Sequence, residues 1–197
     1  MRIESLVEKA KKLKEKGLTT GEIADELNVS RETALWLLTK AREDLAPPSD
    51  IYIEWKSVTK PSRLRYIAAV LSEMIFEKTG SAPDVVVGIA TSGIPLAAMV
   101  AEDLDAALSI YYPRKLKWEE GEKQRGGVFS ENYTSVDGKK CVVVDDIIST
   151  GRTVKETAEA IESRDGKILC AAVIVDKRGT DEIDTIPIVS MFKIVRL

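Results

Sequence analysis

The stretch "VVVDDIISTGRTVKE", residues 142–156, sets two adjacent carboxylates at the end of an apolar run and follows them with a small-residue turn. The run predicts a buried strand over residues 140–144, and the pattern after the turn predicts a helix over 153–164. In an open parallel sheet, ligands bind beyond the carboxyl ends of the strands. Because Asp145 and Asp146 lie at such an end, the stretch predicts a ligand site.

The turn after the two acids has the chemistry of an anion site. Ser149, Thr150, Gly151, Arg152 and Thr153 lead into the N-terminus of the predicted helix. Free backbone N–H groups and the helix dipole favour a phosphate there, and Gly151 allows its close approach. The carboxylates would repel a phosphate but accept hydrogen bonds from sugar hydroxyls. We therefore expect a phosphorylated sugar; the alternative is a plain strand-to-helix connection at a solvated edge.

Helix and strand patterns alternate along the second part of the chain. Helices are predicted over residues 62–77 and 94–103, and strands over 84–90, 108–112 and 168–176. Uniformly apolar strands that alternate with helices indicate an α/β fold, in which helices cover both faces of a parallel sheet.

The N-terminal part reads as a separate helical domain. Helices are predicted over residues 3–16, 21–27 and 31–42, with Thr20 as the N-cap of the second. Pro47 and Pro48 cannot continue a helix and stiffen a short connector. We expect a helical domain over 1–45, a linker over 46–50 and an effector-binding domain over 51–197.

The composition excludes several classes of protein and site. The 197 residues are 44% apolar and 31% charged with a net charge of −3, so bulk charge does not attract polyanions. Two cysteines in apolar runs and no histidine cannot make an ordinary structural zinc site, and Ser-His and Cys-His catalysis are absent. No apolar stretch has the length and composition of a membrane span or secretory signal. We expect a cytoplasmic protein with no direct metal site.

The string "CVVVDDIISTGRT", residues 141–153, resembles the phosphoribosyl-pyrophosphate (PRPP) motif of type I phosphoribosyltransferases. The resemblance implies that fold, with PRPP bound by Asp145, Asp146 and residues 149–153, and Mg²⁺ carried by PRPP rather than held by the protein. "GIATSGIPLAAMVAEDL", residues 88–104, resembles the pyrophosphate loop of orotate phosphoribosyltransferases. Thr91, Ser92 and Gly93 would then present backbone groups to the pyrophosphate.

Two further segments fall at positions that are functional in that family. "YYPRKLKWEEGEKQRGG", residues 111–127, stands where the family has a mobile catalytic loop, which implies roles for Arg114, Lys115 and Lys117; the alternative is a solvated charged loop. "VDKRG", residues 175–179, stands where the family recognises the base. The implied residues on the base side are Lys155, Lys177 and Arg178.

The chain departs from the orotate pattern at positions that matter for catalysis. The loop has Trp118 where the family has a lysine, although Lys117 is adjacent, and it lacks the family's histidine. Lys155 replaces an arginine that helps to hold orotate, and an ammonium group cannot replace a bidentate guanidinium on a carboxylate. We expect PRPP binding to be retained. We expect the contacts for catalysis and for orotate binding to be partly lost.

"TTGEIADELNVSRETALWLLTK", residues 19–40, resembles a helix-turn-helix. The second helix would enter the major groove, with base-edge contacts from its N-terminal side chains and a phosphate contact from Lys40. The candidate readers are Ser30, Arg31, Glu32 and Thr33. Residues 1–45 contain nine basic and nine acidic residues, so non-specific affinity should be modest. The alternative is a helical packing or dimerisation module.

Together, the two parts resemble archaeal orotate phosphoribosyltransferase-like transcription regulators. The resemblance implies a homodimer that binds a double-stranded DNA operator and takes PRPP or a nucleotide as effector. The competing hypothesis is a working phosphoribosyltransferase that uses orotate or a purine base, with the N-terminal domain serving assembly. A third is a purine-salvage enzyme that also regulates.

Overall fold

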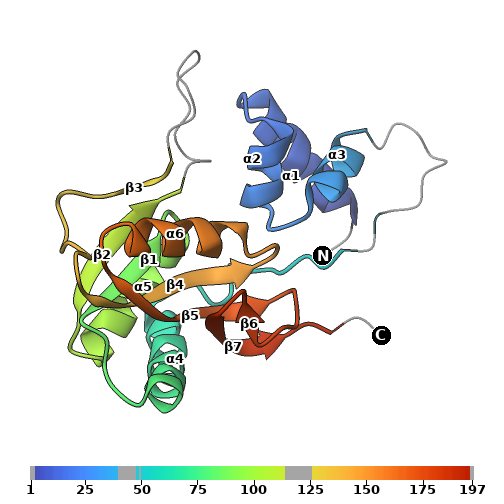
Figure 1. The fold of residues 1–197 in the computed structure, drawn as a ribbon. Coiled ribbons are helices and arrows are strands. Elements are labelled where there is room, and N and C mark those ends of the chain that lie inside the picture. Colours follow the sequence, from blue (N-terminus) through green and yellow to red (C-terminus); the bar gives the residue numbers. More distant parts are fainter. Residues whose placement is uncertain (1–2, 40–47, 49, 114–125, 196–197) are drawn as a thin grey trace. The chain divides into compact units, whose positions relative to one another are not determined.

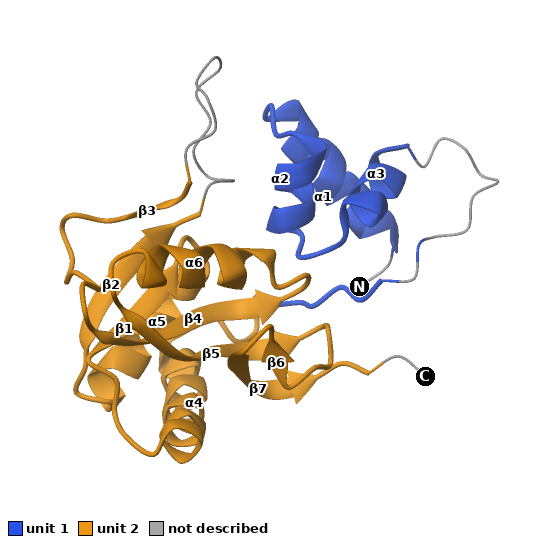
Figure 2. Ribbon diagram, viewed as in Figure 1, with its two compact units in different colours: residues 1–55 blue, residues 56–197 orange. Residues whose placement is uncertain are grey.

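The computed structural model describes residues 3–39, 48, 50–113 and 126–195. The chain divides into two compact units, residues 1–55 and 56–197 (Figure 2). Each unit has an apolar core of its own.

Unit 1 contains three helices, α1 (Ile3–Glu15), α2 (Thr20–Glu26) and α3 (Arg31–Thr39). Each helix contributes apolar residues to one core, which consists of Val7, Ala10, Ile23, Ala24, Leu27, Val29, Ala34 and Leu37. All three predicted helices are present, although residues 40–42 of the last one lie outside the described residues.

Helix α2 begins one residue earlier than the sequence pattern predicts, and the prediction that Thr20 caps it is wrong. The N-cap is Thr19, whose hydroxyl accepts a hydrogen bond from Glu22 N at 3.3 Å. The Glu22 carboxylate accepts one from Thr19 N at 2.6 Å. This reciprocal pair is a capping box, which satisfies two backbone donors at once.

The segment that follows the predicted linker packs on unit 1. Tyr52 lies against the helical core, and its hydroxyl accepts a hydrogen bond from Lys9 Nζ of α1 at 3.0 Å. Residues 50–55 thus pack with the N-terminal helices, whereas the sequence analysis assigns residue 51 onward to the second domain.

Unit 2 is an α/β structure built around one seven-stranded sheet. Its helices are α4 (Pro61–Thr79), α5 (Gly93–Asp103) and α6 (Arg152–Glu162). Its strands are β1 (Val85–Ile89), β2 (Ala107–Tyr112), β3 (Val128–Phe129), β4 (Lys140–Ile148), β5 (Lys167–Asp176), β6 (Glu182–Ile183) and β7 (Ile186–Lys193).

The strand order is β3-β2-β1-β4-β5-β7-β6. Strands β2, β1, β4, β5 and β7 run parallel. The sequence predicts the first four of them as parallel strands, and it does not predict β7. The short strands β3 and β6 pair antiparallel with β2 and β7 at the two edges of the sheet. The sheet is therefore mostly rather than wholly parallel.

Helices cover both faces of the sheet, with α6 on one face and α4 and α5 on the other (Figure 1). Val85, Val87 and Ile89 of β1 share a buried cluster with α6. On the opposite face, Gly88 of β1 packs against α5 so closely that a Cβ atom on it would lie 2.8 Å from the Cβ of Ala97.

The predicted end of the central strand at Val144 is wrong, because β4 continues through both aspartates to Ile148. The neighbouring strand β5 stays apolar and buried through Val175. Its backbone therefore continues to offer pairing partners to β4, as in the pairs of Asp145 with Val173 and Ile147 with Val175.

Candidate functional site

Asp145 and Asp146 lie where β4 extends beyond its neighbour β1. The pairing of β1 with β4 ends at Gly88 and Val144, while β4 continues to pair with β5 as far as Ile148. Residues 90–92 leave β1 and lead into α5, beside the stretch of β4 that β1 does not pair. Both aspartates are half-buried there.

Ser92 joins the predicted pyrophosphate loop to the two acids. Its hydroxyl lies 3.3 Å from Asp145 Oδ1 and 3.0 Å from Asp146 Oδ1, and it donates to these carboxylates. Gly93 is buried against β4, and a Cβ atom on it would lie 2.6 Å from the carbonyl oxygen of Val144. Two motifs more than 50 residues apart therefore meet at one place, and a side chain at Gly93 would separate them.

The pKa of the Asp146 carboxyl reflects its half-buried position. Burial raises the pKa of its carboxyl above the ordinary value, and hydrogen bonds from Ser92 and from neighbouring backbone groups offset only part of this effect. A hydrogen-bond donor or cation that reaches this half-buried carboxylate stabilises its charged form more than it would stabilise that of a solvated carboxylate.

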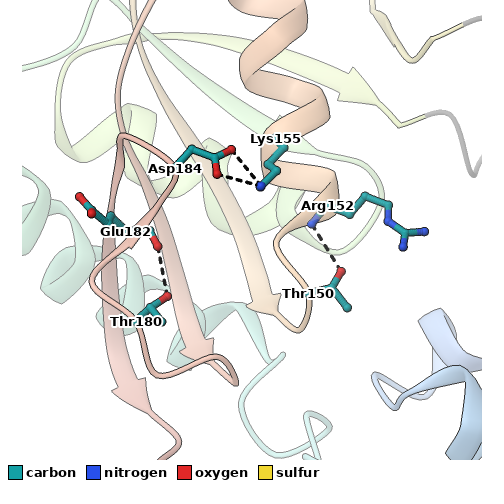
Figure 3. Close-up of polar contacts among 6 residues, drawn as sticks. All are labelled: Thr150, Arg152, Lys155, Thr180, Glu182 and Asp184. Carbon is teal, nitrogen blue, oxygen red and sulfur yellow. Dashed lines mark hydrogen bonds and ion pairs between the residues drawn. The ribbon is translucent and has the colours of Figure 1, made fainter.

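The predicted phosphate turn leads into α6 through Gly151, which adopts a left-handed backbone with φ of 78°. Gly151 is the N-cap residue and has no side chain that could cap this helix N-terminus. Thr150 Oγ1 accepts a hydrogen bond from the backbone N of Arg152 at 3.4 Å (Figure 3). Ser149, Thr150 and Arg152 are exposed. Thr153, at the second position of the helix, is half-buried.

Arg178 lies directly beside the phosphate turn. Its Nη1 atom is 3.1 Å from where a Cβ of Gly151 would stand, and this atom is buried without a hydrogen-bond partner among the described residues. The backbone N of Lys177 donates to Ile148 O at 2.8 Å, which fixes this segment to the end of β4. The base-side segment therefore brings a cation to the turn.

Lys155, the third predicted base-side residue, points away from the turn. Its ammonium group lies 2.9 Å from each carboxylate oxygen of Asp184, in the hairpin between β6 and β7 (Figure 3). The guanidinium of Arg152 extends in another direction, away from this pair. The Lys155 charge is thus compensated within the protein.

Several predicted residues lie outside the described part of the chain. These are Arg114, Lys115 and Lys117 of the predicted catalytic loop, and Lys40 of the first unit. The segment next to that loop is described: Gly127 N donates to Glu156 of α6 at 3.1 Å, and the Tyr111 hydroxyl donates to the same carboxylate oxygen at 3.1 Å.

In unit 1, the four predicted DNA readers lie together at the start of α3. Ser30, Arg31 and Glu32 are exposed, and Thr33 is half-buried. The Ser30 hydroxyl accepts a hydrogen bond from Thr33 N at 3.1 Å, so it caps the helix.

Sequence reasoning missed three aspartates that touch these regions. Asp176, at the end of β5, is 1% exposed and accepts a hydrogen bond from Arg178 N at 2.8 Å. Its position after an apolar run is the signal that identified Asp145, and it could have been found in the same way. Asp184 and Asp50 carry no local signal, because their partners are distant in sequence.

The described residues contain no evident metal site, and their two cysteine thiols are buried. Among them, no group of three or more His, Cys, Asp or Glu side chains is placed to hold a metal ion. Cys141 and Cys170 are free and buried, and burial raises the pKa of each thiol to about 12. None of the described helices is both long and apolar enough to traverse a bilayer.

Comparison with known sequences gives matches over nearly the whole chain. Residues 54–196 match the phosphoribosyl transferase domain family. The chain is 63% identical over 196 residues to the transcriptional regulator GfcR of Archaeoglobus fulgidus, covering 100% of this chain and 99% of the relative. GfcR proteins of Methanosarcina mazei and Haloferax volcanii are 47% and 41% identical, each across 99% of this chain and at least 97% of the relative.

Solved structures share the fold of unit 2. An adenine phosphoribosyltransferase from Thermoanaerobacter pseudethanolicus superposes with a TM-score of 0.59 at 18% identity, covering 77% of this chain and 92% of that one. An orotate phosphoribosyltransferase from Aeropyrum pernix gives 0.55 at 24% identity, covering 75% and 81%. Unit 2 therefore has the type I phosphoribosyltransferase fold; identities this low say nothing about the ligand.

Proposed function

The chain belongs to the family of GfcR transcriptional regulators and carries a phosphoribosyl transferase domain, and on this premise we propose that PRPP or a nucleotide binds unit 2 as the effector of a DNA-binding regulator. Unit 1 contacts the operator, and unit 2 senses the ligand. We propose a cytoplasmic homodimer as the working form.

The observation that carries the effector site is the junction at Ser92. Its hydroxyl is within 3.3 Å of both acids, and the N-terminus of α6, with Gly151 as its N-cap residue, follows the same strand after a short turn. A sugar phosphate has the two kinds of group that this arrangement suits. Its phosphate accepts hydrogen bonds from the turn, and its hydroxyls donate to the aspartates.

The residues around the turn add charge of the right sign for the phosphate. The buried Nη1 of Arg178 is a donor that a bound anion can satisfy. The carboxylates of Asp145 and Asp146 are hard oxygen ligands, so these residues would suit Mg²⁺ carried in by PRPP. The ion would supply positive charge that offsets part of the charge of the pyrophosphate.

The DNA-binding surface is proposed to be the first turn of α3. A helix-turn-helix places these positions against base edges, and Ser30, Arg31 and Glu32 are exposed at this end of the helix. Arg31 is the candidate for a bidentate contact with guanine. Thr33 and Lys40 complete the proposed surface.

Regulation follows from linkage between the two sites. An effector changes operator affinity only if it binds more tightly to one of two arrangements of the dimer, and factors of about 5 to 150 are typical of such coupling. By reciprocity, operator DNA changes effector affinity by the same factor.

The second candidate function is a phosphoribosyltransferase reaction, which the fold of unit 2 favours. Against it stand the absence of histidine and the engagement of Lys155 by Asp184. Catalysis of this kind depends on positioned charges, so the loss of such groups lowers the rate by orders of magnitude.

One pair of measurements on the full chain separates the two functions. A duplex that the protein selects from a random-sequence pool is titrated with protein, with and without PRPP and Mg²⁺. In parallel, pyrophosphate release is followed with PRPP, Mg²⁺ and each free base. We expect a shift of at least about fivefold in DNA affinity and no turnover. Turnover at ordinary enzyme rates with no PRPP-dependent DNA binding would establish the enzyme instead.

A further inference from the structure

Asp50 touches the DNA-facing end of α3 from the segment that leads to unit 2. Its Oδ2 atom accepts hydrogen bonds from Ser30 N at 2.6 Å and from the Thr33 hydroxyl at 3.0 Å. Its other oxygen accepts one from Ile51 N at 2.7 Å, which fixes the orientation of the carboxylate. A negative charge from the interdomain segment is therefore held on two of the four candidate DNA-contacting residues.

Helix capping does not account for this contact. The Ser30 hydroxyl already accepts from Thr33 N, and it also lies 2.8 Å from the Thr33 hydroxyl. The N-cap function at α3 is thus supplied from within the helix. Asp50 engages two further donors at this end of the helix, the backbone N–H of Ser30 and the hydroxyl of Thr33.

The segment that carries Asp50 is fastened to unit 1 at a second place. Lys9 Nζ of α1 donates to the Tyr52 hydroxyl at 3.0 Å, lies 5.4 Å from the centre of the Tyr52 ring, and is 3.9 Å from the Glu54 carboxylate. We name residues 50–54 the strap. The boundary with unit 2 follows directly, between Trp55 and Lys56.

We propose that the strap is autoinhibitory: Asp50 occupies donors at the start of α3 and sets a negative charge where the DNA backbone must approach. This inference rests on the proposed binding of DNA through α3. A carboxylate at that end of α3 repels the DNA phosphates. The hydrogen bonds of Asp50 must also break before the donors of Ser30 and Thr33 that it occupies can bind DNA. The strap ends close to the first residue of unit 2. A rearrangement of unit 2 can therefore move the strap and change the contact of Asp50 with α3.

The test compares Asp50→Ala, Asp50→Asn and Glu54→Gln in the full chain, on the selected duplex and on a random duplex. Asp50→Ala should raise affinity about fivefold or more, because one like charge is removed and two donors are released. The slope of log K against log salt should steepen by about 0.9, as for one added phosphate contact. Asp50→Asn, which keeps the shape of the side chain, should shift affinity in the same direction by a smaller factor.

Glu54→Gln is the matched control, since it removes the same charge from the same strap at a side chain that pairs with Lys9 of α1. It should change DNA affinity by less than about twofold. Equal gains from Glu54→Gln and Asp50→Ala would overturn the proposal in favour of a general charge effect. Weaker DNA binding by folded Asp50→Ala and Asp50→Asn would make Asp50 a positioning residue instead. If the wild-type chain binds neither duplex, the DNA-binding function itself fails, and the proposal with it.

Discussion

At the scale of single residues, Asp146 illustrates how a residue of the proposed binding site can lower the stability of the free protein. Its carboxyl is partly removed from water, which raises its pKa, and the Ser92 hydroxyl compensates only in part. A sugar hydroxyl or cation would supply the interactions that the free protein lacks. The same residue should therefore oppose folding and favour ligand binding.

Asp146→Asn should weaken binding of PRPP by at least about tenfold, because hydrogen bonds to a charged acceptor are lost. The change should also alter how unit 2 stability depends on pH. A carboxyl whose pKa is raised in the folded state binds more protons there than in the unfolded chain. The wild type should thus lose stability as pH rises from the unfolded value of 3.8 through the raised pKa, and the variant should lack this loss.

Calorimetry with PRPP and urea unfolding between acid and neutral pH measure the two effects. Asp105→Asn is the control, because Asp105 is exposed on the turn after α5 and its left-handed backbone suits asparagine. Unchanged PRPP affinity in Asp146→Asn would contradict the assignment of the acids to the sugar.

The sequence-based account of the site succeeds where neighbours in the chain are also neighbours in space. The acids and the 149–153 turn form one strand-turn-helix unit, so their proximity follows from the local pattern. The pairing of Lys155 with Asp184 depends on a hairpin 29 residues away. The contact of Asp50 with Ser30 spans 20 residues. No local periodicity encodes such contacts.

At the scale of elements, the strands also divide into those that a local sequence pattern predicts and those that it does not. The strands β1, β2, β4 and β5 are predictable because apolar residues dominate each of them, although β4 continues through two aspartates. Strands β3 and β6 have two residues each, too few to show a period. Strand β7 ends exposed and contains Pro187, so its pattern is mixed.

Helix α2 gives a prediction about capping. Thr19→Ala should destabilise the helix by about 1 kcal/mol, because the hydroxyl that accepts from Glu22 N is removed. The hydrogen bonds from Thr19 lower the pKa of the Glu22 carboxyl. The part of the stability that the Glu22 carboxylate contributes should therefore be present at neutral pH and be lost as the pH falls through that lowered pKa.

Hydrogen exchange of the α2 amides in the full chain measures this local stability. Thr20→Ala is the matched control, since Thr20 is the first residue inside the helix rather than its cap. Equal destabilisation by both substitutions would mean that the capping box contributes nothing specific.

At the scale of the whole molecule, each unit has its own core and its own proposed ligand. The sheet of unit 2 carries the proposed effector site, and the helical unit 1 contains α3. Communication between them needs an element that has two states. The strap is the element that both contacts α3 and adjoins unit 2.

A symmetric dimer would present two copies of α3, and such heads bind half-sites about 34 Å apart on one face of the duplex. We expect light scattering to give twice the chain mass of 21.7 kDa. Inserting about five base pairs between the half-sites of a selected duplex moves one half-site to the opposite face, so affinity should fall about tenfold or more. Inserting about ten base pairs returns it to the same face and should restore part of the loss. A monomer that binds a single half-site with full affinity would contradict the dimer and the pseudo-palindromic operator together.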